Sequence, residues 1–383
     1  MRILHLYKAY PPVKGGIENT VQLLAEAQAA EGHDVTVIVS APGPLGQRTR
    51  VNGVELMRLG RLAELASTPL SPGLPLALMG RRADIAHLHA PFPPAEVANW
   101  LFGRSRRTVI TWHSDVVRQK RILRFYAPVL RMLLLRADRI FPTSASYLRR
   151  SPFLAEVSSR CQVIPLGIRL DPFLSPDPDG ARRLRLAWGT ARDGRPRPVL
   201  LFVGLLRAYK GLGYLLDAMR RLDARLVIVG DGPEAGHLRE EARDLGVADK
   251  VVFAGRLEDR DLPAAYQAAD LFALPSHLPS EAFGLVLIEA MASALPVVCA
   301  ELGTGTTEVA RSGETALVVP PADSEALAKA LGRLLEDEAL RRRLGEAGRR
   351  RALAEYAAPV YVRRTMEAYE ELLGGARRPA GIS

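Results

Sequence analysis

The chain has 383 residues, of which 48% are hydrophobic and 25% are charged. Since a single domain usually holds roughly 100–200 residues, this length predicts two domains, each with its own core. The two cysteines, Cys161 and Cys299, are too few for a disulfide framework or a zinc site, and they favour a reducing cytoplasm. No signal-peptide pattern and no stretch of about 18 uncharged apolar residues is found, so we expect neither secretion nor a membrane span.

The net charge of +10 is unevenly distributed along the chain. Residues 1–169 carry 23 Lys and Arg against 11 Asp and Glu, whereas residues 170–383 carry 29 against 31. The excess positive charge therefore belongs to the first part of the chain. It predicts a polyanionic partner there, which could be nucleic acid, an anionic membrane surface or a phosphorylated acceptor.

Apolar strand-like segments alternate with helix-like segments from the N-terminus onward. We predict helices at residues 17–31 and 118–137, and strands at residues 2–7, 34–40, 83–90, 107–114, 139–144 and 161–167. Because strand and helix alternate, we expect a parallel sheet with helices on both faces.

The alternation is interrupted and then restarts. Residues 170–180 and 189–198 are rich in Pro, Asp, Gly and other polar residues, which predicts an interdomain linker and a loop. A second set of strands is predicted at residues 198–204, 224–230, 250–255, 271–276, 295–300 and 315–320. We predict a helix at 211–221 within this set, and a mostly helical tail from 324 to 374 that is broken near Pro359.

These elements predict an α/β protein of two doubly wound domains. We place the first domain at residues 1–169, the second at 170–358, and a C-terminal helix that crosses back to the first domain at 359–375. Ligands of such sheets bind outside the carboxyl ends of the strands. Two facing domains of this kind would enclose a cleft.

The segment GLLRAYKG, residues 204–211, lies where a predicted strand ends and a helix begins. A glycine allows the backbone to turn there, and Arg207 and Lys210 would stand beside the N-terminus of the next helix. Such cations suit a diphosphate. A solvated turn with two surface cations fits the same residues.

The segment SEAFGLVLIEAMA joins a predicted strand to a helix that we expect to begin near Gly284. The backbone N–H groups of Phe283, Gly284 and Leu285 would be unpaired at that helix start and could bind phosphate or sugar hydroxyls. Glu281 lies in the loop, and Glu289 follows eight residues later among apolar neighbours. A carboxylate in such surroundings needs a partner, for which ribose hydroxyls would serve; the alternative is a surface glutamate.

Together these motifs resemble those of glycosyltransferase family 4, whose members are retaining enzymes of the two-Rossmann GT-B fold. The matched motifs are Glu-x7-Glu (Glu281 and Glu289), Gly-x5-Lys-Gly (Gly204, Lys210 and Gly211), the VGDGPE turn (Val229–Glu234) and a glycine pair (Gly15–Gly16). The similarity runs in the same order from Met1 to about Tyr369.

By this resemblance, the chain is a metal-independent hexosyltransferase that needs no cofactor besides its nucleotide-sugar substrate. Gly16 would approach the donor diphosphate, and Lys210 and Arg207 would neutralise it as it leaves. Many relatives carry this arginine directly after the strand glycine, where this chain has Leu205. Arg207 lies two residues further, on the same face of an extended segment, and can take that place.

The resemblance also implies roles around the sugar. Glu281 would contact hydroxyls of the transferred sugar as a positioning and charge-stabilising residue rather than a nucleophile, and Glu289 would bind the ribose. His113, at the end of a predicted strand, would contact the donor sugar near its reacting face; a loop histidine satisfied within the protein is the alternative. The run HSDVVRQK resembles a subset of mannosyl- and rhamnosyltransferases of surface-polysaccharide assembly, which favours GDP-mannose as donor.

That subset acts on polyprenyl-diphosphate-linked glycans at the cytoplasmic membrane. We therefore expect a lipid-linked or oligosaccharide acceptor, with contacts from Asp115, Arg118, Lys120 and His89. Residues 104–139 carry ten Lys and Arg against two acids, which fits an anionic lipid surface. The expected location is the cytoplasm, peripherally bound to the inner face of the cytoplasmic membrane.

Several other patterns favour different functions. His87 and His89 have the spacing of metal ligands, but no third or fourth ligand is evident. Asp177 and Asp179 mimic an Asp-x-Asp metal motif but lie in the expected linker, so no metal is expected. The same fold also serves a UDP-N-acetylglucosamine 2-epimerase-like enzyme, and an idle sugar-nucleotide-binding protein is a third reading. The high pI would suit nucleic acid, yet no nucleic-acid-binding module is present, so we expect no nucleic-acid partner.

Overall fold

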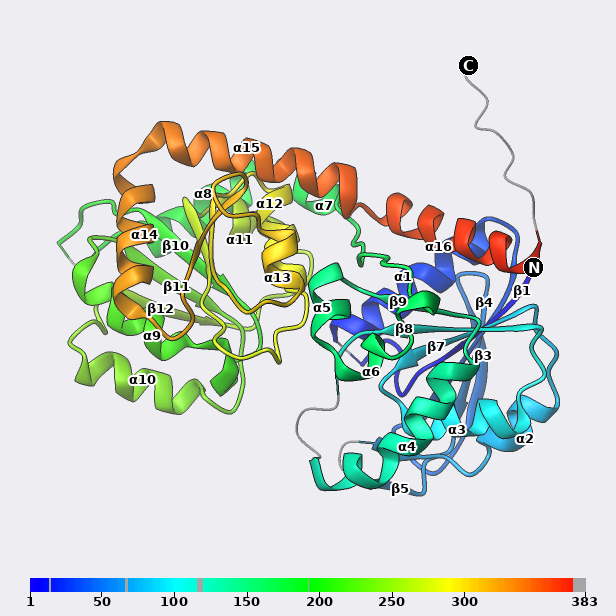
Figure 1. Cartoon of the computed structure of the whole chain (residues 1–383). Helices are drawn as coiled ribbons and strands as arrows, with labels where there is room; N and C mark the ends of the chain where they lie inside the picture. Colours follow the sequence, from blue (N-terminus) through cyan, green and yellow to red (C-terminus); the bar gives the residue numbers. More distant parts are fainter. Residues whose placement is uncertain (14, 66–67, 116–119, 192, 375–383) are drawn as a thin grey trace, which may run out of the picture. The chain divides into compact units, whose positions relative to one another are not determined.

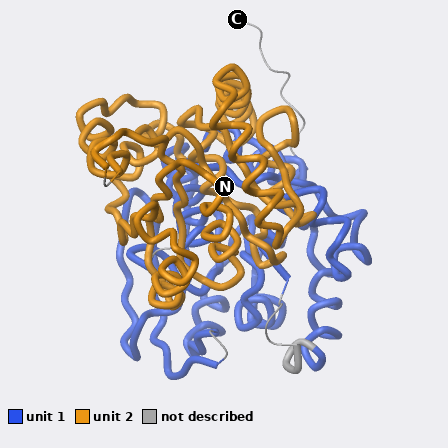
Figure 2. Tube along the Cα trace, turned by 90° about the vertical axis from the view of Figure 1, so that its left-hand side faces the viewer, with its two compact units in different colours: residues 1–168, 358–383 blue, residues 169–357 orange. Residues whose placement is uncertain are grey.

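The computed structural model describes residues 1–13, 15–65, 68–115, 120–191 and 193–374, without the side chains of residues 120–123 (Figure 1). The chain divides into two compact units, coloured separately in Figure 2. The first unit comprises Met1–Ile168 together with Ala358–Ser383, and the second comprises Arg169–Ala357. The last helix therefore belongs to the first unit, although 189 residues of the second unit precede it in the sequence.

The sheet of the first unit has seven strands in the order β3-β4-β2-β1-β7-β8-β9. All neighbours are parallel except β3 and β4. The strands are β1 (Arg2–Leu6), β2 (Asp34–Ser40), β3 (Gln47–Val51), β4 (Val54–Leu59), β7 (Ile85–Ala90), β8 (Arg107–Trp112) and β9 (Arg139–Pro142), with a separate antiparallel pair, β5 (Ala63–Leu65) and β6 (Thr68–Leu70).

Helices cover both faces of this sheet (Figure 1). Helices α1 (Gly16–Ala30) and α16 (Ala358–Leu373) pack together on one face, and α2 (Leu74–Met79), α3 (Pro93–Phe102) and α4 (Lys120–Arg136) lie on the other. The short helices α5 (Ala145–Arg150) and α6 (Pro152–Ala155) and a 3-10 turn, η1 (Ser158–Arg160), follow β9. Because both faces are covered, the central strands β1 and β7 are almost wholly buried.

The second unit has a six-stranded parallel sheet in the order β12-β11-β10-β13-β14-β15. Its strands are β10 (Val199–Val203), β11 (Arg225–Val229), β12 (Val251–Gly255), β13 (Leu271–Leu274), β14 (Val297–Ala300) and β15 (Ala316–Val319). Its helices are α7 (Asp171–Leu174), α8 (Pro178–Gly189), η2 (Ala208–Lys210), α9 (Leu212–Ala218), η3 (Met219–Arg221), α10 (Ala235–Asp244), α11 (Leu262–Gln267), α12 (Leu285–Ala292), α13 (Gly305–Val309), α14 (Ser324–Glu336) and α15 (Glu338–Glu355).

Two expectations for the segment between the sheets are wrong. Residues 161–167 form only an isolated bridge to β9: the N–H groups of Gln162 and Ile164 donate to the carbonyls of Ile140 and Pro142, but Pro142 has no N–H to donate in return. The expected linker at 170–180 instead contains α7 and the start of α8. Asp177 caps α8 by accepting a hydrogen bond from the N–H of Gly180 at 3.0 Å, so the Pro and Asp residues begin a helix.

The glycine at the start of α9 is fixed by its surroundings. Gly211 has a φ of 68°, and a Cβ built on it would lie 2.2 Å from the carbonyl oxygen of Pro275, directly after β13. Only a residue without a side chain fits such a close approach of two backbones. Gly211 therefore holds the turn that carries Lys210 against the end of β13.

We expect Gly211→Ala to lower the urea midpoint of the second unit strongly, because it adds a backbone clash to the strain of a left-handed residue. Gly313→Ala is the matched control: Gly313 has a φ of 75° but no atom within 4 Å of a built Cβ. The control should lose only about 1 kcal/mol of unfolding free energy. Equal losses in the two variants would show that the contact with Pro275 is not restrictive.

Candidate active site

In the second unit, the predicted diphosphate turn lies at the carboxyl end of β10. The strand ends at Val203, and the chain passes through Gly204 and the single turn η2 to Gly211. Lys210 is 7% exposed, and its side chain crosses back over Gly204. Arg207 begins η2 and remains partly exposed. One cation is thus buried within the site and the other stands at its margin.

Lys210 and Glu281 form a buried ion pair. The Nζ of Lys210 donates to Oε2 of Glu281 at 2.5 Å, and the Oγ of Ser276 donates to the same oxygen at 3.0 Å. Glu281 is 8% exposed, and its backbone carbonyl accepts a hydrogen bond from the Oγ1 of Thr304 at 2.8 Å. The structure therefore brings together the two residues that stood 71 positions apart in the sequence motifs.

Helix α12 begins beside this ion pair. Gly284 is its N-cap, with a φ of 77°, and no side chain caps the helix. Phe283 is buried, with its ring edge-on to Tyr356, whereas Leu285 is partly exposed. The first N–H groups of α12 thus form an uncapped helix start, which favours an anionic ligand.

Glu289 lies one turn from the end of α12 and accepts a hydrogen bond from the hydroxyl of Tyr266 at 2.6 Å. Desolvation by burial raises the pKa of Glu289, although the Tyr266 hydrogen bond acts in the opposite direction. Its neighbours Ile288 and Ala290 are fully buried. The carboxylate thus has a protein partner and is not a solvated surface group.

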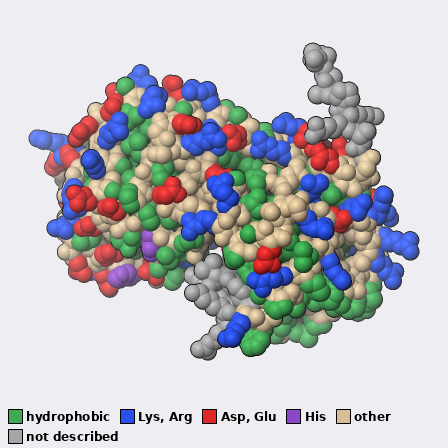
Figure 3. Space-filling view, viewed as in Figure 1, with side chains coloured by type: hydrophobic (Ala, Val, Ile, Leu, Met, Phe, Trp, Pro, Cys, Tyr) green, Lys and Arg blue, Asp and Glu red, His purple; other side chains and the backbone are tan. Residues whose placement is uncertain are grey.

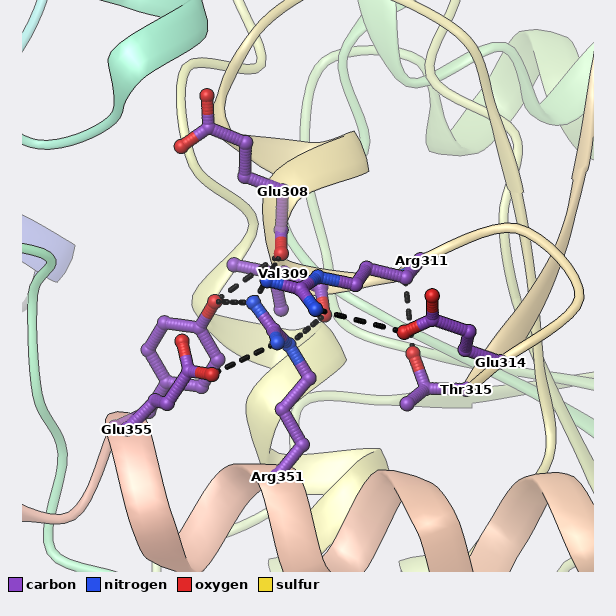
Figure 4. Close-up of polar contacts among 8 residues, drawn as sticks. Glu308, Val309, Arg311, Glu314, Thr315, Arg351 and Glu355 are labelled. Carbon is purple, nitrogen blue, oxygen red and sulfur yellow. Dashed lines mark hydrogen bonds and ion pairs between the residues drawn. The ribbon is translucent and has the colours of Figure 1, made fainter.

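Helix α13, which follows β14, is held at its C-terminal end by Arg351 of α15 (Figure 4). The Arg351 guanidinium donates to the carbonyl of Glu308 at 2.8 Å and to that of Val309 at 3.2 Å, and it pairs with Glu355 at 2.8 Å. A cation on the last carbonyls of a helix stabilises that end. The other end of α13 carries Thr304, whose hydroxyl holds the loop of Glu281.

In the first unit, Gly16 is the first residue of α1, and Gly15 before it is fully extended. A Cβ on Gly15 would lie 2.1 Å from a carboxylate oxygen of Glu18, so that side chain folds back against the helix start. Glu18 is itself buried. The glycine pair therefore lets a buried carboxylate lie close to the first turn of α1.

His113 directly follows β8 and belongs to a stacked row of buried histidines. Its Nε2 lies 3.2 Å from Nδ1 of His89, and Nε2 of His89 lies 3.1 Å from Nδ1 of His5. His87 stacks on His89 with 4.3 Å between ring centroids. His5, on β1, was missed in the sequence analysis. Its place opposite His87 depends on strand register, which the sequence does not show.

Three of these histidines could in principle hold a metal, because ligand atoms of His5, His87 and His89 lie within 4.8 Å of one another. Each of their ring nitrogens is already hydrogen-bonded: His5 to Gln28 and His89, and His87 to Thr111 and Tyr369. A metal would have to displace these bonds. The site fits a hydrogen-bonded network better than a metal centre.

The predicted acceptor contacts lie in different surroundings. Asp115 accepts from the indole of Trp112 at 3.0 Å and from the hydroxyl of Ser151 at 2.8 Å, and desolvation by burial raises its pKa. His89 is 1% exposed and has both nitrogens bonded to other histidines. Arg118 and the side chain of Lys120 lie outside the described residues. Their acceptor roles stay predictions.

Two family models match the chain: "Glycosyl transferases group 1" over residues 192–351 and "Glycosyltransferase Family 4" over residues 14–172. The chain is also 34% identical over 380 residues to the O-antigen chain mannosyltransferase C of Escherichia coli, covering 97% of this chain and 99% of that protein. The chain belongs to glycosyltransferase family 4.

Further similarities agree with this membership. The glycosyltransferase is 35% identical over 339 residues to the D-rhamnosyltransferase WbpZ of Pseudomonas aeruginosa, covering 88% of this chain and 87% of that protein. The structure of sucrose-phosphate synthase from Thermosynechococcus elongatus matches with a TM-score of 0.78 and 26% identity, covering 98% of this chain and 100% of that one. The expected GT-B fold and the retaining transferase class are confirmed, and the epimerase reading is set aside.

The contribution of the ion pair to the stability of this glycosyltransferase can be tested directly. We expect Lys210→Met to lower the unfolding free energy by about 3–5 kcal/mol, because it leaves the buried Glu281 carboxylate without its counter-charge. Adding Glu281→Gln should restore part of this loss, since the double variant buries no charge at the pair. Urea titrations of the two single variants and the double variant measure the coupling; strictly additive losses would contradict it.

Proposed function

We propose that this glycosyltransferase transfers a hexose, with GDP-mannose as the favoured donor, to a hydroxyl of a lipid-linked or oligosaccharide acceptor in cell-surface polysaccharide assembly. The two reported relatives support this choice, since one is a mannosyltransferase and the other a D-rhamnosyltransferase. D-Rhamnose is D-mannose without its 6-hydroxyl, so the two sugars share the arrangement of their other hydroxyls. The uncapped start of α12 beside the buried Lys210 is the observation that carries the donor site.

In the proposed reaction, the acceptor oxygen bonds to the anomeric carbon while the bond from that carbon to the donor phosphate oxygen breaks. The nucleoside diphosphate leaves with the bonding electrons, and a phosphate oxygen of that leaving group takes the proton of the acceptor hydroxyl. Negative charge grows on that diphosphate, where Lys210, Arg207 and the N–H groups at the start of α12 would stabilise it. Gly16, at the start of α1, would bring further backbone close to the phosphates.

Lys210 is held in place by Glu281 before any donor arrives. The hydrogen bonds of Glu281 to Lys210 and Ser276 occupy one carboxylate oxygen, Oε2, and leave Oε1 for hydroxyls of the transferred sugar. A fixed ion pair spares the enzyme the reorganisation of a flexible lysine when charge develops. Glu289 would accept a hydrogen bond from a ribose hydroxyl, in place of or beside the one from Tyr266. His113 would accept a hydrogen bond from a hydroxyl of the sugar.

Donor binding tests this proposal. We expect GDP-mannose to raise the melting temperature more than UDP-, dTDP- or ADP-sugars do, and Lys210→Ala to lose most of that shift. Lys329→Ala, on the exposed side of α14, is the matched control and should keep it.

Turnover of Glu281→Gln should fall more than threefold, which corresponds to a rise of more than ~0.7 kcal/mol in the barrier. No response to any of these sugar nucleotides would contradict the proposed donor, whereas binding without turnover would point to an idle sugar-nucleotide-binding protein.

We further propose that the first unit binds the inner face of the cytoplasmic membrane. None of the helices within the described residues combines the length and the apolar character needed to cross a bilayer. Exposed apolar side chains nevertheless gather over α2, α3 and α4 (Figure 3). Leu76 is 71% exposed, Leu101 55% and Phe125 82%, and the guanidinium of Arg136 lies 5.3 Å from the ring of Trp100.

This surface, formed by Leu76, Trp100, Leu101, Phe125 and Arg136, combines apolar side chains with the basic α4. Apolar groups can enter the headgroup region while each nearby cation adds about 1 kcal/mol on an anionic membrane. Salt weakens the electrostatic part of such binding. The combination supports a peripheral membrane contact more directly than net charge alone.

We expect the protein to sediment with anionic liposomes and not with neutral ones at low salt, and to be released as salt rises. The double variant Leu101→Ser, Phe125→Ser should bind several-fold less. Leu186→Ser is the matched control, because Leu186 is 63% exposed on α8 of the second unit and should not matter. Equal sedimentation with neutral and anionic liposomes would contradict the proposal.

A further inference from the structure

The row of buried histidines in the first unit is built by three adjacent parallel strands. His5 lies on β1 opposite His87 of β7, His89 lies two residues further along β7, and His113 follows β8. All four are at most 4% exposed. On a face that α1 and α16 cover, apolar residues would be the ordinary filling. A buried polar row in their place calls for a reason.

The hydrogen bonds of this row run in series from α1 to His113. The Oε1 of Gln28 lies 2.7 Å from Nε2 of His5, whose Nδ1 lies 3.1 Å from Nε2 of His89. Nδ1 of His89 then lies 3.2 Å from Nε2 of His113. Nδ1 of His113, at the far end, has no partner among the described residues. The series therefore ends on one unused ring nitrogen.

The amide of Gln28 fixes the direction of this series. Its Nε2 donates to Sδ of Met366 on α16 at 3.4 Å, and a hydrogen bond from Gln28 to Tyr369 partly offsets the effect of burial on the pKa of that hydroxyl. Both neighbours can accept from the amide N–H groups. The amide oxygen is thus turned towards His5, and an amide oxygen only accepts.

Each ring in the series carries a single N–H. Burial lowers the pKa of His5 to about 4 and that of His113 to about 3, and it holds the pKa of His89 well below its usual range. His5 must donate from Nε2 to Gln28, so its Nδ1 accepts from Nε2–H of His89. Nδ1 of His89 accepts in turn from Nε2–H of His113.

We propose that Gln28, His5 and His89 are positioning residues that hold His113 as the Nε2–H tautomer, so that its Nδ1 lone pair accepts a hydroxyl of the transferred sugar. The role at the sugar rests on the proposed function of His113, whereas the tautomer follows from the network alone. The opposite tautomer would present an N–H at the same place and could accept nothing. The imidazole acts as a neutral acceptor aimed by its neighbours.

The series orients His113 and does not transport protons. Its far end is a carboxamide, which has no titratable proton to give or take near neutral pH. His87 lies beside the series rather than in it, because its nitrogens bond to Thr111 at 2.6 Å and to the hydroxyl of Tyr369. Thr111→Val therefore disturbs the same cluster without touching the series, whereas Tyr369 also bonds to Gln28, so Thr111→Val is the matched control.

The tautomer of His113 can be read from imidazole ¹⁵N shifts in protein labelled at its seven histidines, with His113→Gln to assign the signal. We expect protonated Nε2 and unprotonated Nδ1 in the wild type. Gln28→Met, which removes the terminal acceptor, should give a mixture of tautomers. Thr111→Val should leave the wild-type pattern. A wild-type His113 protonated at Nδ1, or the same shift change in both variants, would overturn the proposal whatever the donor is.

Turnover shows whether the tautomer matters. With the donor identified by the binding panel, we expect kcat of Gln28→Met to fall at least fivefold while the KM for the acceptor stays within twofold. The control Thr111→Val should keep kcat within twofold. A mixed tautomer with unchanged kcat would overturn the role of His113 at the sugar. Because the ¹⁵N measurement uses no substrate, a wrong choice of donor would leave the tautomer result unchanged.

Discussion

The buried ion pair of Lys210 and Glu281 is the interaction on which the candidate site in the second unit of this glycosyltransferase depends. It joins the loop after β10 to the loop after β13, two strands that are neighbours in the sheet. The loop after β13 leads directly into α12, so the cation, the carboxylate and the uncapped helix start are set by one contact. Removing either partner would leave the other charge buried and uncompensated.

The surroundings of this pair are themselves held by backbone contacts. Gly211 allows the lysine turn to touch the carbonyl of Pro275, and Thr304 fixes the backbone of Glu281. Arg351 secures the opposite end of the helix that Thr304 precedes. A site that stabilises charge gains from such rigidity, since its dipoles need not reorganise during the reaction.

The first unit uses a different device. Instead of an ion pair, it buries a row of neutral imidazoles whose nitrogens, apart from Nδ1 of His113, are satisfied by one another, by Gln28 and by Thr111 and Tyr369. Such a bonded network specifies one arrangement, because another would leave further polar groups unpaired. The last helix, α16, takes part through Met366 and Tyr369, so a segment distant in sequence helps to orient the residue that follows β8.

The sequence by itself determined the class of fold and most residues of the candidate site. Alternating apolar runs predicted the parallel strands, since period and burial are properties of local sequence. Spacing motifs identified Lys210, Glu281 and Glu289, because their neighbours in sequence form the turns and helix starts that carry them. Local signals were also present where the prediction was wrong: Pro142 of β9 has no N–H with which to pair the expected strand, and Asp177 and Pro178 begin a helix in the expected linker.

Only the tertiary structure decided which side chains meet. The partner of Lys210 is 71 residues away, and Tyr266 reaches Glu289 from a different helix. His5 and Gln28 could not be linked to His113 from sequence, because strand order and register, not spacing, bring β1, β7 and β8 together. The direction of the hydrogen bonds in that row depends on α16, whose first residue lies 330 positions after Gln28 in the sequence. Local patterns fix elements, whereas the pairing of distant elements fixes the chemistry of the site.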